Sequence, residues 1–145
     1  MSEGNNTDKV LVIPCSGIGK AFGSVGREAA YLVIEDMRPE KTGTLCLSLL
    51  TMGDEEARMA VNRWPTITLD GCPKACARVN VEASGGTPTV EFRVVDTYRE
   101  HRELKVNSVL DLGENGRRLA QILADKVAAE VDRILSEKED ATNHA

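Results

Sequence analysis

Four cysteines are the residues of this chain whose type and spacing best suit chemistry: Cys15, Cys46, Cys72 and Cys76. A cysteine thiolate is both a ligand for soft metal ions such as zinc and a nucleophile. In the segment DGCPKAC, Pro73 suits the first position of a helix, which makes Cys72 the predicted cap residue. Cys76, four residues later, would share a helix face with Cys72. Because a helix N-terminus stabilises thiolates, this pair is predicted to hold one metal ion.

Cys15 opens a glycine-rich segment, VLVIPCSGIGKAF, which at first sight suits a phosphate-binding loop. It does not fit that motif, because Pro14 stands where the first glycine belongs and Ala21 where a magnesium-binding Ser or Thr belongs. The glycines allow backbone N–H groups to approach a ligand closely, and the predicted ligand is a sulfur-bound metal. Four thiolates on one zinc ion carry a formal charge of about −2, which needs such donors when it is buried.

Apolar runs and helical periodicities alternate along the chain. Strands are predicted over 9–14, 42–50, 66–71 and 89–96, and helices over 24–37, 53–64, 72–84 and from residue 114 onward. The segment 97–113 has no clear pattern and is expected to be mostly loop. The alternation predicts an α/β fold: a small three-layer sandwich with a mostly parallel sheet of about four strands and a long C-terminal helix. One domain is expected over 9–137, with flexible ends at 1–8 and 138–145.

The cysteines fall near the ends of the predicted strands. Cys15 follows the first strand, Cys46 lies in or at the end of the second, and Cys72 follows the third. Since parallel strands end at one edge of a sheet, where ligands of such folds bind, the four sulfurs are predicted to gather in one pocket there. The alternative is that they are small buried core residues, which suits Cys46 best. Asp70 is either an acceptor beside the metal or part of a turn.

Composition limits the partners of the protein. The chain of 145 residues has a net charge of −5 and 3% aromatic residues, which argues against nucleic acid and anionic membranes as partners. The N-terminal segment lacks the apolar core of a signal peptide and no apolar run is long enough to span a membrane, so a cytoplasmic protein is expected. In that compartment cysteines serve more often as metal ligands or redox thiols than as disulfides. The oligomeric state stays open.

The other titratable residues offer little for catalysis. The two histidines, His101 and His144, lie in a charged run and in the C-terminal tail. No carboxylate pair and no serine–histidine arrangement is recognisable, which argues against a conventional hydrolase. Lys20 and Arg27 are candidates to hold an anionic substrate near the cysteines, although a solvated surface role is the simpler interpretation.

The segments LVIPCSGIGKAFGSVGREAAYLVIEDMRPEKTGTLCLSLL and ITLDGCPKACARVNVEASG resemble the DGC-domain family, for which zinc binding has been proposed and which is named after an Asp-Gly-Cys motif. That motif is here Asp70, Gly71 and Cys72, and the resemblance extends from about Val10 to the final helix. The four cysteines proposed as metal chelators in the family match Cys15, Cys46, Cys72 and Cys76. The resemblance therefore implies a zinc protein but names no reaction.

Three functions fit these residues. A closed site of four thiolates on one zinc ion would serve an accessory, delivery or sensing role, because it leaves no open position for a catalytic water. A thiol redox or sulfur-transfer enzyme would use Cys72 or Cys15 as nucleophile and Cys76 as resolving thiol, although C-x-x-x-C is not the usual redox spacing. An iron–sulfur cluster could use the same four ligands.

Overall fold

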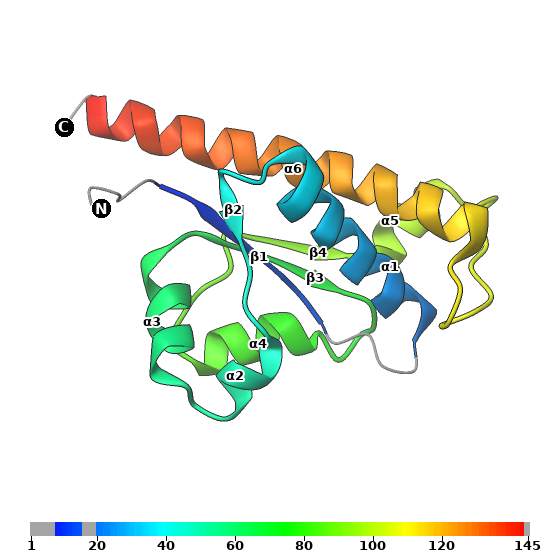
Figure 1. Ribbon diagram of the computed structural model, residues 1–145, viewed down its shortest axis with the longest axis horizontal. Coiled ribbons are helices and arrows are strands. Elements are labelled where there is room, and N and C mark those ends of the chain that lie inside the picture. Colours follow the sequence, from blue (N-terminus) through cyan, green and yellow to red (C-terminus); the bar gives the residue numbers. More distant parts are fainter. Residues whose placement is uncertain (1–7, 16–19, 144–145) are drawn as a thin grey trace.

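A parallel sheet forms the middle layer of the molecule (Figure 1). The computed structural model describes residues 8–15 and 20–143, and in this part of the chain four strands pair in the order β2-β1-β3-β4. The strands are β1 (Val10–Pro14), β2 (Thr42–Gly43), β3 (Thr66–Asp70) and β4 (Val90–Arg93). The helices are α1 (Ala21–Tyr31), the π-helical η1 (Leu32–Met37), α2 (Leu47–Thr51), α3 (Glu55–Arg63), α4 (Cys76–Ala83), α5 (Val94–Glu100) and α6 (Gly113–Asn143). Helices cover both faces of the sheet, and the predicted α/β class is confirmed.

Strand β1 supplies side chains to both hydrophobic cores. Val10 and Val12 pack in the core that contains α1 and α6. Leu11 and Ile13 pack in the opposite core, with α2, α3 and α4. Successive side chains of a strand point to opposite faces, so a strand covered on both sides must be apolar at every position. That requirement explains the continuous apolar run from which this strand was predicted.

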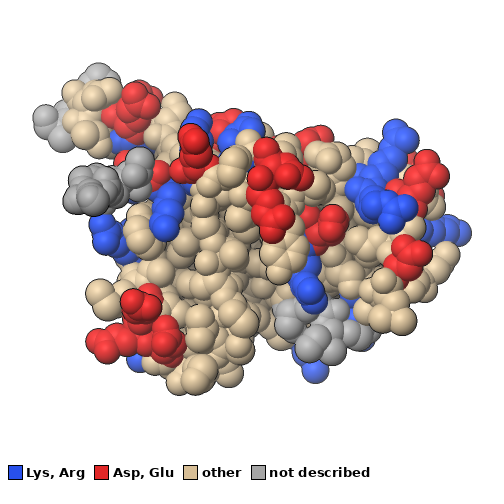
Figure 2. Space-filling view, in the orientation of Figure 1, with Lys and Arg blue, Asp and Glu red and all other residues tan. Residues whose placement is uncertain are grey.

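The long helix α6 covers one face of the sheet together with α1 and η1 (Figure 1). Its buried stripe follows the predicted spacing of three and four residues: Leu119, Leu123, Val127, Val131 and Ile134. Burying each of these side chains contributes about 1.5–3 kcal/mol. Charged side chains of both signs lie along the outward side of α6, at the top of Figure 2. The helix continues to Asn143, past the boundary placed at residue 137 from the sequence.

No helix in the described residues is both long and apolar enough for a membrane span.

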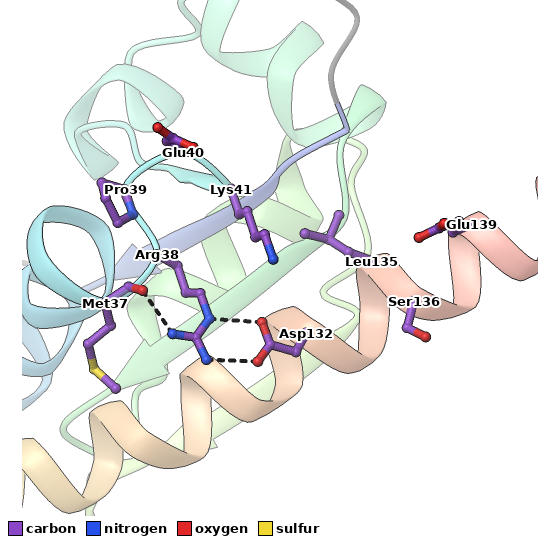
Figure 3. Close-up of a pocket in the computed structure, with 9 residues that line it drawn as sticks. All are labelled: Met37, Arg38, Pro39, Glu40, Lys41, Asp132, Leu135, Ser136 and Glu139. Atoms are coloured by element: carbon purple, nitrogen blue, oxygen red, sulfur yellow. Dashed lines mark hydrogen bonds and ion pairs between the residues drawn. The ribbon is translucent and has the colours of Figure 1, made fainter.

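The end of η1 is tied to α6 by one arginine. The N–H of Arg38 donates to the carbonyl of Val33 at 2.7 Å, a bond that spans one residue more than in an α-helix. The Arg38 guanidinium then donates to both carboxylate oxygens of Asp132, at 2.8 and 2.7 Å (Figure 3). Arg38 also donates to the carbonyl of Met37 at 2.8 Å. This forked ion pair fixes the turn that leads from η1 into β2.

Three shorter helices, α2, α3 and α4, cover the other face of the sheet, below it in Figure 1. The predicted cap of α3 is confirmed, because the Asp54 carboxylate accepts a hydrogen bond from the N–H of Ala57 at 3.0 Å. Leu50, Val61, Ala77 and Val81 from these helices pack against the odd-numbered residues of β1. We refer to this side of the sheet as the α2–α4 face.

The predicted strand over 42–50 is wrong for most of its length. Only Thr42 and Gly43 pair with β1, and the chain then leaves the sheet to form α2 from Leu47. The segment TLCLSLL is apolar at nearly every position, so its pattern does not separate a buried strand from a short buried helix. In the structure its leucines pack in the core of the α2–α4 face.

Because β2 is so short, no described strand pairs with the carboxyl end of β1 on that side, which leaves this edge uncovered by a strand. The N–H groups of Leu11 and Cys15 donate toward β3, to the carbonyls of Pro65 and Leu69, at 2.9 and 3.0 Å. Backbone donors alternate along a strand, so the nitrogen of Pro14 faces the uncovered edge. Proline has no N–H, and this position therefore leaves no unpaired donor.

The predicted strand over 89–96 is wrong in its second half. Strand β4 ends at Arg93, and α5 runs from Val94 to Glu100. The helix therefore takes in the end of the predicted strand and the start of the segment 97–113, which was expected to be mostly loop. Val94 is fully buried, and its Cγ2 lies 3.4 Å from where a Cβ on Gly26 of α1 would stand. Packing against α1 therefore overrides the strand preference of the two valines.

The turn after β3 lies directly against the first turn of α1. A Cβ added to Gly71 would lie 2.4 Å from the backbone nitrogen of Gly23 and 2.6 Å from its Cα. Atoms in proteins do not approach so closely, and both neighbours are backbone atoms that cannot rotate away. Glycine at position 71 is therefore a packing requirement of the sheet edge.

We expect Gly71→Ala to lower the free energy of unfolding by about 2 kcal/mol or more, because the methyl group forces the turn away from α1. Gly43→Ala is the matched control, since its Cβ would make an ordinary contact at 3.6 Å with Leu11. Urea denaturation of both variants measures the difference. Equal stability of the two variants would contradict the close approach of the turn to α1.

Candidate metal and thiol site

Cys15 is fixed at the carboxyl edge of the sheet by the pairing of β1 with β3. Its N–H donates to the carbonyl of Leu69 at 3.0 Å, which continues the ladder one residue beyond Pro14. Cys15 is 9% exposed and belongs to the core of the α2–α4 face. This placement follows from the strand alternation, because Cys15 lies two residues after Ile13. The glycines that follow it, in 16–19, lie outside the described residues, so their predicted role as donors to a metal site stays a prediction.

The helix that follows β3 is capped by Asp70 and not by Cys72, so the predicted cap is wrong. Helix α4 begins at Cys76, and its N-cap is Ala75, which has a left-handed backbone with φ +50°. The two carboxylate oxygens of Asp70 accept the N–H groups of Ala77 and Arg78, at 2.8 and 3.1 Å. The turn made by Cys72 to Ala75 returns the helix start to the strand end. The Asp70 carboxylate thus accepts hydrogen bonds from two of the N–H groups that were predicted to stabilise a Cys72 thiolate.

Burial changes the ionisation of this carboxyl group. Asp70 is 3% exposed. Desolvation raises its pKa above the usual value, while the hydrogen bonds from Ala77 and Arg78 and the charge of Arg78 act in the opposite direction. The net result is a carboxyl group that is harder to ionise than a surface aspartate. The sequence left its role open between a turn and an acceptor beside a metal, because its partners lie in another element.

Cys46 is an exposed cap residue of α2 and not a core residue. Its backbone is extended, and α2 starts directly after it at Leu47. Its sulfur lies 2.9 Å from the hydroxyl oxygen of Ser48. The pKa of the Cys46 thiol is lowered by that hydroxyl group first and then by the backbone N–H groups of Ser48 and Leu49. Ser48 was not recognised in the sequence, where Cys-x-Ser before a leucine pair is unremarkable.

Cys15 and Cys46 line one hollow, which we call the thiol hollow. Its volume is about 690 Å³. The described residues that line it are Pro14, Cys15, Arg27, Tyr31, Ile34 and the segment 44–48. The hollow therefore lies at the uncovered edge of β1, between α1 with η1 on one side and the start of α2 on the other. Arg27, proposed from the sequence as an anion ligand, faces it, whereas Lys20 is the cap residue of α1 and is not on its wall.

Cys72 and Cys76 are not among the described residues that line the thiol hollow. Cys72 is half-buried in the turn after β3, and Cys76 is exposed at the first position of α4. Helices α2 and α4 are joined by a hydrogen bond from the Thr51 hydroxyl to the Asn80 side chain, at 3.1 Å. Asn80 in turn donates to the carbonyl of Cys76 at 2.8 Å. The structure thus brings Cys15 and Cys46 to one hollow, while Cys72 and Cys76 lie in the turn before α4 and at its start.

The four sulfurs do not form a preformed metal site. Within residues 8–15 and 20–143, no group of three or more His, Cys, Asp or Glu side chains is placed to hold a metal ion. The gathering of all four cysteines around one ion therefore stays a prediction. His101 lies apart from them, with its Nδ1 3.8 Å from the carboxylate of Glu103, and His144 lies outside the described residues.

The sequence profile of the DGC domain matches residues 11–134 of the chain, which includes all four cysteines. The chain belongs to the DGC-domain family. The resemblance stated from the sequence is therefore confirmed. Neither a search of curated proteins nor one of solved structures gives a match.

In this DGC domain the three residues of the motif have three different structural roles. Asp70 caps α4, and Gly71 lets the turn lie against α1. Cys72 comes directly after these two fixed points and is half-buried. The aspartate and glycine thus determine where the chain presents the cysteine.

We expect the stability difference between the wild type and Asp70→Asn to depend on pH. A carboxyl group whose pKa is raised in the folded state binds more protons in the folded protein than in the unfolded protein. The difference exists in the pH window between the usual pKa of 3.8 and the higher folded-state pKa. The free energy of unfolding of the wild type should therefore fall relative to Asp70→Asn as the pH rises through that window. Urea denaturation at a series of pH values measures it. A relative stability that rises instead would show that the hydrogen bonds from α4 outweigh burial.

We expect Cys46 of the reduced, metal-free protein to react with iodoacetamide at a lower pH than an ordinary cysteine, because the Ser48 hydroxyl stabilises its thiolate. Ser48→Ala should move the pH midpoint of the reaction upward. Thr44→Ala, a change on the same segment two residues from the sulfur, is the control and should leave it unchanged. Peptide mass spectrometry follows the modification of each cysteine. An unchanged midpoint in Ser48→Ala would rule out the hydroxyl group as the cause.

Proposed function

We propose that this DGC-domain protein binds a soft metal ion, with zinc as the first candidate, through the thiolates of Cys15, Cys46, Cys72 and Cys76. The observation that carries the proposal is the position of these residues. All four stand at the ends of secondary-structure elements: after β1, before α2, after β3 and at the start of α4. A role in metal delivery, sensing or assistance to another protein suits a site made of thiolates alone.

The four cysteines are suitable ligands for zinc, but in the structure they are not positioned around one ion. None of the four cysteines is part of a disulfide, and thiolate sulfur is a preferred zinc ligand. Because no group of three ligands is in place among the described residues, binding would require the cysteines to approach one another. Cys46 and Cys72 lie outside the helices and strands, in segments 44–46 and 72–75, so such an approach would involve a rearrangement of these segments.

Charge supports metal binding at the second cysteine pair. The first-turn donors of α4 that were expected to stabilise a Cys72 thiolate are taken by the Asp70 carboxylate. These two N–H groups do not donate to the sulfur of Cys72. A bound metal ion would supply positive charge there, and ligation deprotonates a thiol outright. The protein would then release protons when it takes up zinc.

A second candidate function is thiol–disulfide chemistry, favoured by the exposed Cys46 and the neighbouring Cys15 on the thiol hollow. The Cys46 thiolate would attack a disulfide of a small substrate and release one thiol. Cys15 would then displace the second thiol, so that the substrate disulfide is reduced to two thiols while a Cys15–Cys46 disulfide forms. This assignment replaces the nucleophile and resolving thiol proposed from the sequence.

We expect the reduced protein to bind about one equivalent of zinc, and cobalt in its place to give the near-ultraviolet absorption of thiolate ligation. Each of the variants Cys15→Ser, Cys46→Ser, Cys72→Ser and Cys76→Ser should lose at least about tenfold in affinity, since even changes beside a ligand cost that much. Thr44→Ala, which leaves all four cysteines in place, is the control. Competition with a chromogenic chelator measures the affinities.

Several outcomes of this experiment would contradict the zinc proposal. Wild type that binds well under one equivalent, with all thiols open to alkylation, would do so. Turnover of glutathione disulfide by the metal-free protein, lost in Cys46→Ser and in Cys15→Ser, would favour the thiol enzyme. A brown protein after purification without oxygen, carrying iron and sulfide, would favour an iron–sulfur cluster at the same cysteines.

A further inference from the structure

One exposed side of α4 carries no charged residue. Cys76, Val79 and Ala83 are exposed and follow one another at spacings of three and four residues, so they share one side of the helix. Val79 is 45% exposed, which is high for a valine. The two charged residues of α4, Arg78 and Glu82, follow an adjacent side of the helix and pair with each other at 2.9 Å.

Helix α2 extends this uncharged area. The Thr51 hydroxyl donates to the Asn80 side chain of α4 at 3.1 Å, and Met52, the next residue, is 76% exposed. In Figure 2 the area where Figure 1 shows α2 in front of α4 is largely free of charged side chains, although charged residues make up 28% of the chain. We call the exposed residues of this area the uncharged strip: Ser48, Thr51, Met52, Cys76, Val79 and Ala83.

Opposite charges stand at the two ends of the uncharged strip. Lys74 is exposed in the turn that precedes α4. Glu55 and Glu56 are exposed in the first turn of α3, and Glu55 lines a hollow together with Ser84, the C-cap residue of α4. Within the described residues, the side chains of Lys74, Glu55 and Glu56 form no hydrogen bond or ion pair. A cation at the start of α4 and two carboxylates near its end are therefore available to a partner.

This arrangement is complementary to itself. A twofold axis near Val79 would set two copies of α4 antiparallel, so that Lys74 of each copy faces Glu55 and Glu56 of the other. The uncharged middle of the strip would meet its own copy, which avoids the repulsion expected between two chains that each carry a net charge of −5. A partner with charge of a single sign would match one end of the strip and be repelled by the other.

We propose that a second copy of this chain docks on the uncharged strip and forms a twofold-symmetric dimer. Met52 and Val79 supply the apolar contact, and the unbranched side chain of Met52 adapts to the facing surface. The charges at the two ends fix the antiparallel direction. The dimer does not depend on a bound metal. It covers the side of α4 that carries Cys76, and so limits access to this thiol.

Sedimentation velocity of the full-length, reduced, metal-free protein, from micromolar to millimolar concentration, measures the self-association. We expect the wild type to shift from monomer to dimer over this range. Lys74→Glu should weaken the association at least about tenfold, because each dimer loses two attractive contacts and gains two repulsive ones. Glu55→Lys combined with Glu56→Lys should do the same. Lys105→Glu, the same charge reversal at an exposed position beyond α5, is the control and should associate as the wild type does.

Mixing the two charge-reversed proteins gives the sharpest test. In an equimolar mixture of Lys74→Glu with the Glu55→Lys, Glu56→Lys protein, both end contacts are attractive again, so a heterodimer should form although neither protein dimerises well alone. Circular dichroism checks that each variant is folded. If the double variant does not fold, Val79→Glu tests the same interface, because the twofold axis brings two copies of the new carboxylate together and should weaken the dimer.

Three outcomes would overturn the proposal. The first is a wild type that stays monomeric at millimolar concentration, which would leave the strip to a different protein. The second is a dimer that Lys74→Glu or Val79→Glu weakens no more than Lys105→Glu does, which would place the contact on another surface. The third is a mixture of folded charge-reversed proteins that associates no better than either protein alone.

Discussion

The pairing of β1 with β3 is the constraint on which the rest of this molecule depends. The register runs from Leu11 opposite Thr66 to Pro14 opposite Leu69. It brings Cys15 and Asp70 out of the sheet side by side, although 54 positions separate them in the chain. A slip of one residue would move every side chain of β1 to the other face, and Cys15 would leave the α2–α4 face. The apolar residues on both faces of β1 therefore also specify the place of the thiol.

The carboxylate of Asp70 connects this sheet edge to the chemistry proposed for it. By capping α4 it fixes the helix that carries Cys76, and it withdraws the helix donors from Cys72. Cys46 differs from these two cysteines in its surroundings, because the Ser48 hydroxyl and the backbone of α2 lower the pKa of its thiol.

The parts of the fold that local pattern determines could be predicted from the sequence. Strands β1 and β3, the Asp54 cap and the stripe of α6 each depend on spacing within one element. The start of α4 could not be predicted, because it requires a left-handed backbone at Ala75 and a carboxylate from the preceding strand. The strand predicted around Cys46 was wrong for another reason: the run of leucines in this segment suits a strand and a helix equally. The placement of Cys15 and Cys46 on a hollow that Cys72 and Cys76 do not line is a property of tertiary packing, which spacing along the chain does not contain.

The π-helical stretch η1 has a consequence for the way this chain can tolerate insertions and deletions. A π turn holds one residue more than an α turn, and each residue in an α-helix rotates the following side chains by about 100°. Deleting one residue between Leu32 and Met37 would convert the wide turn into an ordinary one while preserving the buried face of α1. Everything that follows would then be rotated, and Arg38 would no longer point at Asp132. The extra residue of η1 thus sets the direction in which the chain leaves the helix. With it, α1 keeps its buried face and the chain still turns back toward the sheet.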